Sequence, residues 1–126
     1  MRRLAAPCAL LLLAVGCGGD DSEQSSRTVT VDAGGTLEVT AHEYAFDPDR
    51  VVVEGAGALT IELANDGDLA HNIRVRRNGE EIGGTPSFPA GRTESARLRL
   101  SRGSYELLCT VGDHAELGMK GELEVK

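Results

Sequence analysis

Apolar and polar side chains alternate with a period of two through most of the chain after Arg27, and turn residues break the alternation at short intervals. Clear examples are residues 37–41, 59–63 and 97–100, in which an aliphatic residue occupies every second position. Because successive side chains of a β-strand point to opposite faces, this pattern predicts strands with one buried face. We find no stretch with convincing helical periodicity. The sequence therefore predicts an all-β domain over residues 28–126.

The spacing of the expected strands indicates which all-β architecture they form. We count seven or eight short strands, separated by turns such as residues 46–49 and 65–68 and by the strong hairpin signal Asn78-Gly79. Residues 83–91 are expected to form an irregular loop. Strands of this length and spacing are typical of a Greek-key β-sandwich, in which two sheets pack face to face. The loops of such a sandwich gather at its two ends, where residues distant in sequence can form one site.

The first 16 residues have the features of a signal peptide. Arg2 and Arg3 precede an apolar run, residues 4–15, which is too short to span a bilayer. The run ends in Leu13-Ala14-Val15-Gly16-Cys17, which resembles a bacterial lipobox, although that motif prefers leucine where Ala14 stands. In a lipoprotein, signal peptidase II cuts before the cysteine, which then carries lipid, so Cys17 is the expected lipidation site. The alternative is ordinary secretion, with Cys17 removed or left free.

Residues 18–27 are polar, so residues 17–27 are expected to form a flexible tether between a membrane anchor at Cys17 and the domain at 28–126. This arrangement would place the domain outside the cytoplasm, in a periplasm or on the outer face of the cell membrane. The formal net charge of −7 argues against nucleic acid as a partner and favours basic or neutral docking proteins. We expect a monomer.

Processing of the N-terminus also decides the state of the three cysteines. Cys8 would leave with the signal peptide and Cys17 would carry lipid, so Cys109 would remain as the single thiol. A single thiol cannot form an internal disulfide and is a liability in an oxidising compartment unless it is buried or bound to a metal. Cys109 shares strand parity with Tyr105 and Leu107, which places the thiol on the inner face of its strand.

Residues 105–119 carry three potential metal ligands. Cys109, His114 and Met119 follow the spacing C-x4-H-x4-M within one strand end and one loop. A fourth candidate is His71, which shares the parity of the apolar positions that follow it and would point inward from the first position of its strand. Two imidazoles, a thiolate and a more distant thioether form the ligand set of a blue-copper centre.

Each of these residues has a simpler interpretation when it is taken alone. A lone cysteine is usually a small core residue, a lone inward histidine is usually structural, and a lone methionine usually fills a gap in a core. The four residues together, at this spacing, favour the binding of one copper ion. His42 is different, because it lies on the polar face of its strand and nothing pairs it with the loop. We expect His42 to be solvated.

These motifs resemble those of the cupredoxins, the small blue-copper family that includes plastocyanin, azurin and auracyanin, over nearly all of residues 28–126. The resemblance implies His71, Cys109 and His114 as equatorial copper ligands and Met119 as the axial ligand. It also implies that Asn72 braces the ligand loop and hydrogen-bonds near the thiolate. The matching segments are Ala45-Phe46-Asp47-Pro48, Asn65-Asp66-Gly67, His71-Asn72, Thr85-Pro86 through Gly91, Gly103-Ser104-Tyr105 and Gly118-Met119-Lys120-Gly121.

The ligand loop departs from the family pattern at one place. Relatives with this loop length often have Pro-Gly before the second histidine, whereas Gly112-Asp113 precedes His114 in this chain. A more flexible loop and an adjacent carboxylate would change the basicity of His114 or the hold on the metal. The ligands themselves are intact, so the departure concerns the tuning of the copper site.

The resemblance implies a one-electron carrier whose single type 1 copper ion cycles between Cu(II) and Cu(I). The N-terminal segment makes this an extracytoplasmic carrier, and we expect no enzymatic activity. Redox partner proteins would dock near His114, whose edge lies in an apolar patch in the family. Here the patch would consist of Gly112, Ala115, Leu117 and Gly118.

Two other functions are compatible with part of the pattern. A copper-delivery lipoprotein would bind Cu(I) and pass it to another protein, but the chain has no methionine-rich or histidine-rich tract and carries a full trigonal ligand set. A metal-free sandwich that binds a protein partner is disfavoured because all four ligands are present. A multicopper oxidase would need further histidine clusters, and a binuclear copper centre would need a second cysteine in the loop.

Overall fold

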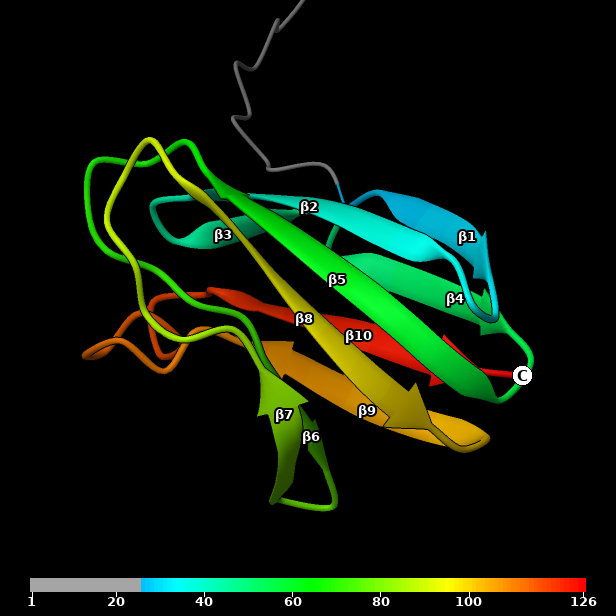
Figure 1. Cartoon of the computed structure of the whole chain (residues 1–126). Helices are drawn as coiled ribbons and strands as arrows, with labels where there is room; N and C mark the ends of the chain where they lie inside the picture. The colour runs from blue at the N-terminus through cyan, green and yellow to red at the C-terminus, as the bar shows by residue number, and fades with distance from the viewer. Residues whose placement is uncertain (1–25) are drawn as a thin grey trace, which may run out of the picture.

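The computed structural model of the chain describes residues 26–126 (Figure 1). The expected signal peptide (1–16), the lipidation site Cys17 and residues 18–25 of the expected tether lie outside the described residues. In the described part of the chain, no helix is long and apolar enough to cross a membrane. At the start of the described part, the backbone N–H of Arg27 donates to Asp49 Oδ1 at 2.9 Å, and its guanidinium pairs with Asp47.

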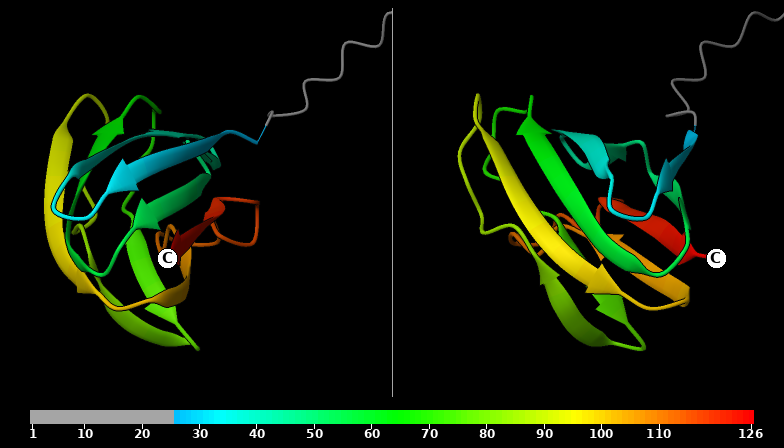
Figure 2. Two further views of the ribbon diagram at one scale, coloured as in Figure 1. Left: turned by 90° about the vertical axis from the view of Figure 1, so that its right-hand side faces the viewer. Right: turned by 45° about the vertical axis from the view of Figure 1, so that its right-hand side comes forward.

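Two β-sheets pack face to face, which confirms the predicted all-β sandwich (Figures 1 and 2). In spatial order the six-stranded sheet contains β1 (Thr28–Asp32), β4 (Arg50–Glu54), β10 (Lys120–Val125), β9 (Gly103–Leu108), β6 (Arg74–Arg77) and β7 (Glu80–Gly84). The four-stranded sheet contains, in order, β3 (Ala45–Asp47), β2 (Thr36–His42), β5 (Gly57–Asn65) and β8 (Thr93–Leu100). Both sheets are mixed, because β4 runs parallel to β1 and β10, and β2 runs parallel to β5.

The alternating segments place their apolar residues between the two sheets, as predicted. Burying one aliphatic side chain of this size contributes roughly 1.5–3 kcal/mol, so this layer dominates the stability of the fold. It also gives the loops at the ends of the sandwich a rigid base. Its members, each at most 7% exposed, include Leu37, Val39, Ala41, Leu59, Ile61, Leu63, Leu98 and Leu100 from the four-stranded sheet and Val51, Val53, Val75, Tyr105, Leu107, Leu123 and Val125 from the six-stranded sheet.

Residues 26–126 form ten strands, where the alternation predicted seven or eight. One of the additional strands is β3, which overlaps the segment 46–49 that was expected to form only a turn. It pairs antiparallel with the end of β2, with Ala45 opposite His42 across a two-residue connection. A strand of three residues is too short to show an alternation, so pairing with β2, rather than local pattern, defines it.

The second difference is β7, which ends inside the segment 83–91 that was expected to be an irregular loop. Its last residue, Gly84, has a φ of +146° and lies against the backbone of Ile73 and Arg74. A Cβ at this position would collide with the carbonyl oxygen of Ile73. Only glycine permits such a close approach, and glycine contributes nothing to an apolar–polar alternation. The pattern therefore could not reveal this strand end.

Four connections gather at one end of the sandwich, on the left in Figure 1. They are the turn between β2 and β3, residues 66–73 between β5 and β6, residues 85–92 between β7 and β8, and residues 109–119 between β9 and β10. The C-terminus lies at the other end. All the predicted ligands belong to these connections, so this end of the sandwich holds the candidate site.

Candidate metal centre

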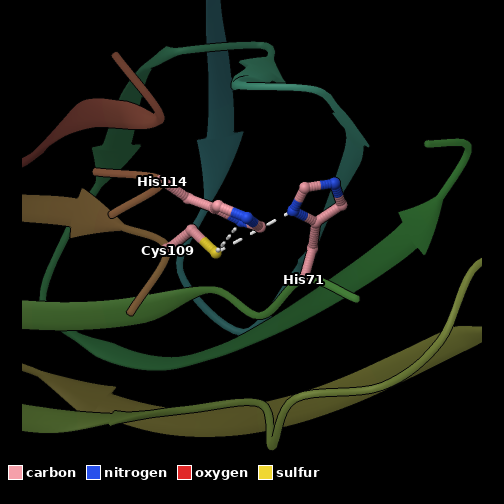
Figure 3. Close-up of side chains that lie close together, drawn as sticks. All are labelled: His71, Cys109 and His114. Carbon is pink, nitrogen blue, oxygen red and sulfur yellow. Dashed lines mark hydrogen bonds between the residues drawn. The ribbon is translucent and has the colours of Figure 1, made fainter. Parts of the chain in front are cut away.

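Three potential metal ligands converge inside the loop end of the sandwich (Figure 3). The Sγ of Cys109 lies 3.6 Å from Nδ1 of His114 and 3.9 Å from Nδ1 of His71. These donor atoms all lie within 4.8 Å of one another. Cys109 and His71 are fully buried, and His114 is 7% exposed. The structure thus brings together three of the four residues that strand parity and loop spacing predicted, around one point.

His71 is held in place by its own backbone. It forms an antiparallel bridge with Phe88, in which each residue donates its N–H to the carbonyl oxygen of the other, at 3.2 and 3.0 Å. The sequence pattern placed His71 at the first position of a strand, but β6 begins only at Arg74. The bridge takes over the role of the strand, because it fixes the backbone and directs the imidazole into the interior as predicted.

The second ligand segment, residues 109–119, is closed by backbone hydrogen bonds among its own residues. Cys109 directly follows β9 and donates its N–H to the carbonyl oxygen of Met119 at 3.1 Å, just before β10 begins. Met119 in turn donates its N–H to the carbonyl oxygen of His114 at 3.0 Å. Met119 is completely buried. The C-x4-H-x4-M spacing is therefore the length of one closed loop that starts and ends at the metal centre.

Within this loop, Gly112 has a φ of +48°, in the left-handed region that favours glycine. Asp113 follows it and is exposed. Its carbonyl oxygen accepts the N–H of Leu117 at 3.1 Å, and His114 donates its N–H to Val111 at 3.1 Å. The Gly112-Asp113 sequence that departs from the cupredoxin pattern thus forms a turn with its own backbone hydrogen bonds.

Asn72 connects the two ligand segments. Its Nδ2 donates to Oγ1 of Thr110 at 2.8 Å, and its Oδ1 accepts the backbone N–H of Thr110 at 2.8 Å. Thr110 follows Cys109 directly, so the amide clamps the chain next to the thiol. Asn72 is only 6% exposed. The bracing contact that the resemblance implied for Asn72 is present.

Glu43, which was not predicted as a site residue, contacts His71. Oε1 of Glu43 accepts hydrogen bonds from Nε2 of His71 at 3.0 Å and from the backbone N–H groups of Asp68 and Leu69 at 2.7 and 2.8 Å. The N–H of Leu69, followed by the contacts with His71 and Asp68, lowers the pKa of Glu43 to about 2. Glu43 lies 28 residues before His71 in a two-residue turn, and no spacing rule links the two positions.

Two aromatic contacts complete the surroundings of the donors. The ring of Tyr44 meets the ring of His114 edge-on, with centroids 5.0 Å apart, and the centroids of His71 and His114 are 4.9 Å apart. Tyr44 therefore packs directly against one predicted ligand, which the sequence analysis also missed. His42, only two residues away, is exposed at the end of β2 and is not among the clustered donors, as expected.

The donor separations fit one type 1 copper ion. With metal–sulfur and metal–nitrogen bonds of ~2.3 and ~2.0 Å, as at protein-bound zinc, trigonal ligands lie about 3.7 Å apart in each sulfur–nitrogen pair. The observed separations of 3.6 and 3.9 Å bracket this value. A thiolate, two imidazoles and a buried methionine are the donors that blue-copper centres use. The residues present therefore fit the copper ion that the fold implies.

The surface near the site carries exposed apolar side chains. Leu117, in the ligand loop, is 52% exposed, and Leu69, in the connection that leads to His71, is 44% exposed. Gly112 and Gly118 are exposed and Ala115 is partly exposed, as the predicted patch requires. Leu69 was not predicted as part of this surface. The only indication in the sequence is that Leu69 is an apolar residue next to a polar turn.

Comparison with solved structures identifies the fold. An auracyanin from the photosynthetic bacterium Roseiflexus castenholzii is 24% identical and superposes with a TM-score of 0.68, covering 75% of this chain and 98% of its own. Rusticyanin from Thiobacillus ferrooxidans is 19% identical, with a TM-score of 0.65 over 81% of this chain and 84% of its own. Auracyanin A, a "blue" copper protein from Chloroflexus aurantiacus, is 22% identical, with a TM-score of 0.64 over 78% and 100%.

Sequence comparison adds no further relative, since no protein-family model and no curated protein matches the chain. At identities of 24% or lower, the likeness to these three proteins is one of fold.

Proposed function

We propose that this chain, which has the cupredoxin fold of these solved structures, is an extracytoplasmic one-electron carrier with a single type 1 copper centre. The observation that carries the proposal is the convergence of Cys109 Sγ, His71 Nδ1 and His114 Nδ1 in a buried position. His71, Cys109 and His114 would be the equatorial ligands, and Met119 the weak axial ligand. When bound, copper supplies the one-electron Cu(II)/Cu(I) couple.

The protein residues contribute rigidity and exclusion of water. The bridge at Phe88, the backbone bonds of Met119 and the clamp by Asn72 fix the donors from three directions. Because the interior of a protein is close-packed, donors held in this way move little when a charge arrives or leaves. Small rearrangement is what a carrier needs for rapid electron transfer, and the burial of Cys109 also protects its thiol from oxidation.

The path for the electron would pass through His114. This residue has the most exposed side chain of the three clustered donors, and Leu117 in its loop presents an apolar contact surface. A small apolar patch on a protein whose net charge is −7 suits brief docking with a basic or neutral redox protein. Buried donors leave no open coordination position for a substrate, so the site favours electron transfer over catalysis.

The location outside the cytoplasm is proposed from the N-terminal sequence alone. A lipid at Cys17 would anchor the domain through residues 17–27. Expression of the full chain in a bacterium, followed by membrane fractionation and mass spectrometry, tests this directly. We expect a membrane-bound product that begins at a lipidated Cys17, and a Cys17→Ser variant that is no longer lipidated. An unlipidated wild-type product in the soluble fraction would contradict the anchor.

The proposed electron-carrier function is tested by loading the domain with copper. We expect an intense visible absorption band from thiolate-to-Cu(II) charge transfer, reversible one-electron reduction, and loss of the band in Cys109→Ser. Asp113→Asn, which alters an exposed loop residue outside the donor set, is the matched control and should keep the band. A colourless wild-type protein, or one that takes up copper only weakly, would refute the proposal.

The alternative of copper delivery is separated from electron transfer by ligand exchange. A delivery protein must release Cu(I), whereas the four fixed and buried residues of this site favour retention. The reduced protein is therefore mixed with a high-affinity Cu(I) chelator, and loss of the blue band after reoxidation is followed over time. Slow loss together with fast electron exchange supports a carrier. Fast transfer of copper to the chelator supports delivery.

A further inference from the structure

Glu43 is the only carboxylate that contacts one of the clustered donors among the hydrogen bonds of residues 26–126, through Nε2 of His71. We propose that Glu43 is a positioning residue: it orients His71 so that Nδ1 serves as the metal ligand, and its charge lowers the reduction potential of the bound copper. This inference rests on the proposed function, because the potential is that of the proposed copper centre. The orientation of His71 is a property of the protein alone.

The first step concerns the proton on His71. A neutral imidazole has one N–H, which is on either Nδ1 or Nε2. An ionised carboxylate only accepts hydrogen bonds, and Oε1 of Glu43 lies 3.0 Å from Nε2 of His71. The proton therefore belongs on Nε2, which leaves the lone pair of Nδ1 directed toward Cys109, 3.9 Å away. The outer hydrogen bond of a metal-binding histidine selects its tautomer in this way.

The second step concerns how the carboxylate is held. The backbone N–H groups of Asp68 and Leu69 donate to the same oxygen that His71 contacts. A Cβ at Gly67 would collide with the carboxyl group of Glu43, so the glycine leaves the space that the carboxylate occupies. The loop that leads to His71 is thus shaped around Glu43. The side chain of Glu43 is 29% exposed, so this is a fixed but partly solvated charge.

The third step is electrostatic. A negative charge at the outer nitrogen of His71 acts along the imidazole and stabilises Cu(II) more than Cu(I), because the oxidised ion carries one more positive charge. The Cu(II)/Cu(I) equilibrium shifts toward Cu(II), and the reduction potential falls. A neutral acceptor in the same place would keep the hydrogen bond and lose this effect.

A purely structural role is the competing explanation, in which Glu43 only fastens residues 66–70 to the turn between β2 and β3. Glu43→Gln separates the two roles, because the amide oxygen can still accept from His71, Asp68 and Leu69 while the charge is gone. Glu116→Gln is the matched control, since it removes the same charge from an exposed position two residues after His114. The control measures the general effect of net charge near the site.

The reduction potentials of the copper-loaded wild type, Glu43→Gln and Glu116→Gln are measured by voltammetry at one pH and ionic strength. We expect Glu43→Gln to shift the Cu(II)/Cu(I) equilibrium about tenfold toward Cu(I), which is comparable to the smallest effects that changes of outer ligand contacts have on metal affinity. For a one-electron couple this is a rise of ~59 mV. Glu116→Gln should shift it much less. An unchanged potential in Glu43→Gln, or equal shifts in both variants, would overturn the proposed charge effect.

The orientation of His71 is tested without copper, by ¹⁵N NMR of the ring nitrogens in the metal-free protein at mildly alkaline pH. We expect the proton on Nε2 in the wild type and in Glu43→Gln, and a mixture of tautomers in Glu43→Leu. A wild-type proton on Nδ1 would overturn the positioning role. If the wild type has the Nε2–H tautomer but forms no blue copper centre, the proposed function fails while the orientation by Glu43 stands.

Discussion

Asn72 joins the two chain segments that carry the buried donors. One hydrogen bond runs from its amide to the hydroxyl of Thr110 and one from the backbone of Thr110 to its carbonyl, both at 2.8 Å. Asn72 is 6% exposed and Thr110 is exposed, so the two bonds lie at the boundary between the interior and the solvent. The side chain of Asn72 therefore links the segment of His71 to the segment of Cys109, and it stabilises the fold whether or not metal is bound.

Asn72→Ala should destabilise the metal-free domain by about 1 kcal/mol, because it removes both hydrogen bonds to Thr110, while water can still reach the exposed threonine. Urea unfolding of the metal-free proteins measures this difference. Thr110→Val is the matched control, since it removes only one of the two hydrogen bonds and should cost less. An Asn72→Ala variant as stable as the wild type would show that the two hydrogen bonds do not contribute to the stability of the fold.

Glu43 gives the metal-free protein a pH dependence of its own. Its pKa is lowered from the ordinary value of 4.5 to about 2, chiefly by the backbone N–H of Leu69. A group whose pKa is lower in the folded state stabilises that state when it is ionised. The contribution of Glu43 is thus fully present above pH 4.5 and is lost as the pH falls toward 2.

We expect the stability advantage of the metal-free wild type over Glu43→Gln to be constant above pH 5 or so and to shrink as the pH falls through this window. Urea unfolding of both proteins at a series of pH values measures it. Glu116→Gln is again the control, because its carboxylate is exposed. An advantage that grows on acidification would contradict the assigned hydrogen bonds.

At the level of elements, the sequence predicted those strands in which alternation and burial coincide. These strands each bury one face against the opposite sheet, so apolar and polar residues alternate along their sequences. They are β2, β5, β8, β9 and β10. β3 is too short for a pattern, and β7 ends in two glycines, of which Gly83 lies against the side chain of Leu98 and Gly84 against the backbone of Ile73. Local alternation therefore identifies strands that face the core and misses strands defined by pairing or close approach.

The same distinction holds for the site. Cys109, His114 and Met119 were predictable because one closed loop contains them, and His71 because its parity follows a strand pattern. Glu43 and Tyr44 were not, since they lie in a two-residue turn and reach the donors only through tertiary contacts. Residues that touch a ligand from outside its own segment leave no periodic signal in the sequence.

The connection between β8 and β9 is fastened by one side chain. The hydroxyl of Tyr105 donates to the carbonyl oxygen of Ser101 at 2.8 Å and accepts the N–H of Ser101 at 3.1 Å. The guanidinium of Arg77, from β6, donates to the same hydroxyl at 3.2 Å and lies 5.2 Å from the ring centroid. One phenol thus ties three strands together at the end of the sandwich away from the metal centre.

Tyr105→Phe should lower the free energy of unfolding by about 1 kcal/mol, because the ring remains packed while the hydrogen bonds of its hydroxyl are lost. Thermal or urea unfolding of the metal-free protein measures the change. Tyr44→Phe is the matched control, since no hydrogen bond of its hydroxyl is found within residues 26–126, and it should change stability little. The copper spectrum should be unaffected by Tyr105→Phe, because the phenol is remote from the donors.

For the whole molecule, the sandwich and the metal centre are coupled through the loop end. The donors come from two connections, one that leads into β6 and one that follows β9. These two strands pair through Arg74 and Leu108, and a metal bound to all the donors would add a crosslink beyond that pairing. A ligand that binds the folded state and not the unfolded state stabilises the fold by mass action. This coupling makes global stability a measure of the metal centre that is independent of colour and redox activity.

Removal of copper should therefore lower the free energy of unfolding by roughly 4 kcal/mol when free copper had been a thousandfold above its dissociation constant. Copper-loaded and chelator-treated proteins are compared by thermal unfolding, which should show a clear drop in Tm on chelation. Cys109→Ser lacks the thiolate donor, so its Tm should change little between the two conditions, whereas Glu116→Gln should respond like the wild type. Equal Tm values for the loaded and stripped wild type would mean that copper, if bound at all, does not connect the two loops. A comparable drop in Cys109→Ser would instead place the stabilising copper outside the proposed centre, because the site described here depends on that thiolate.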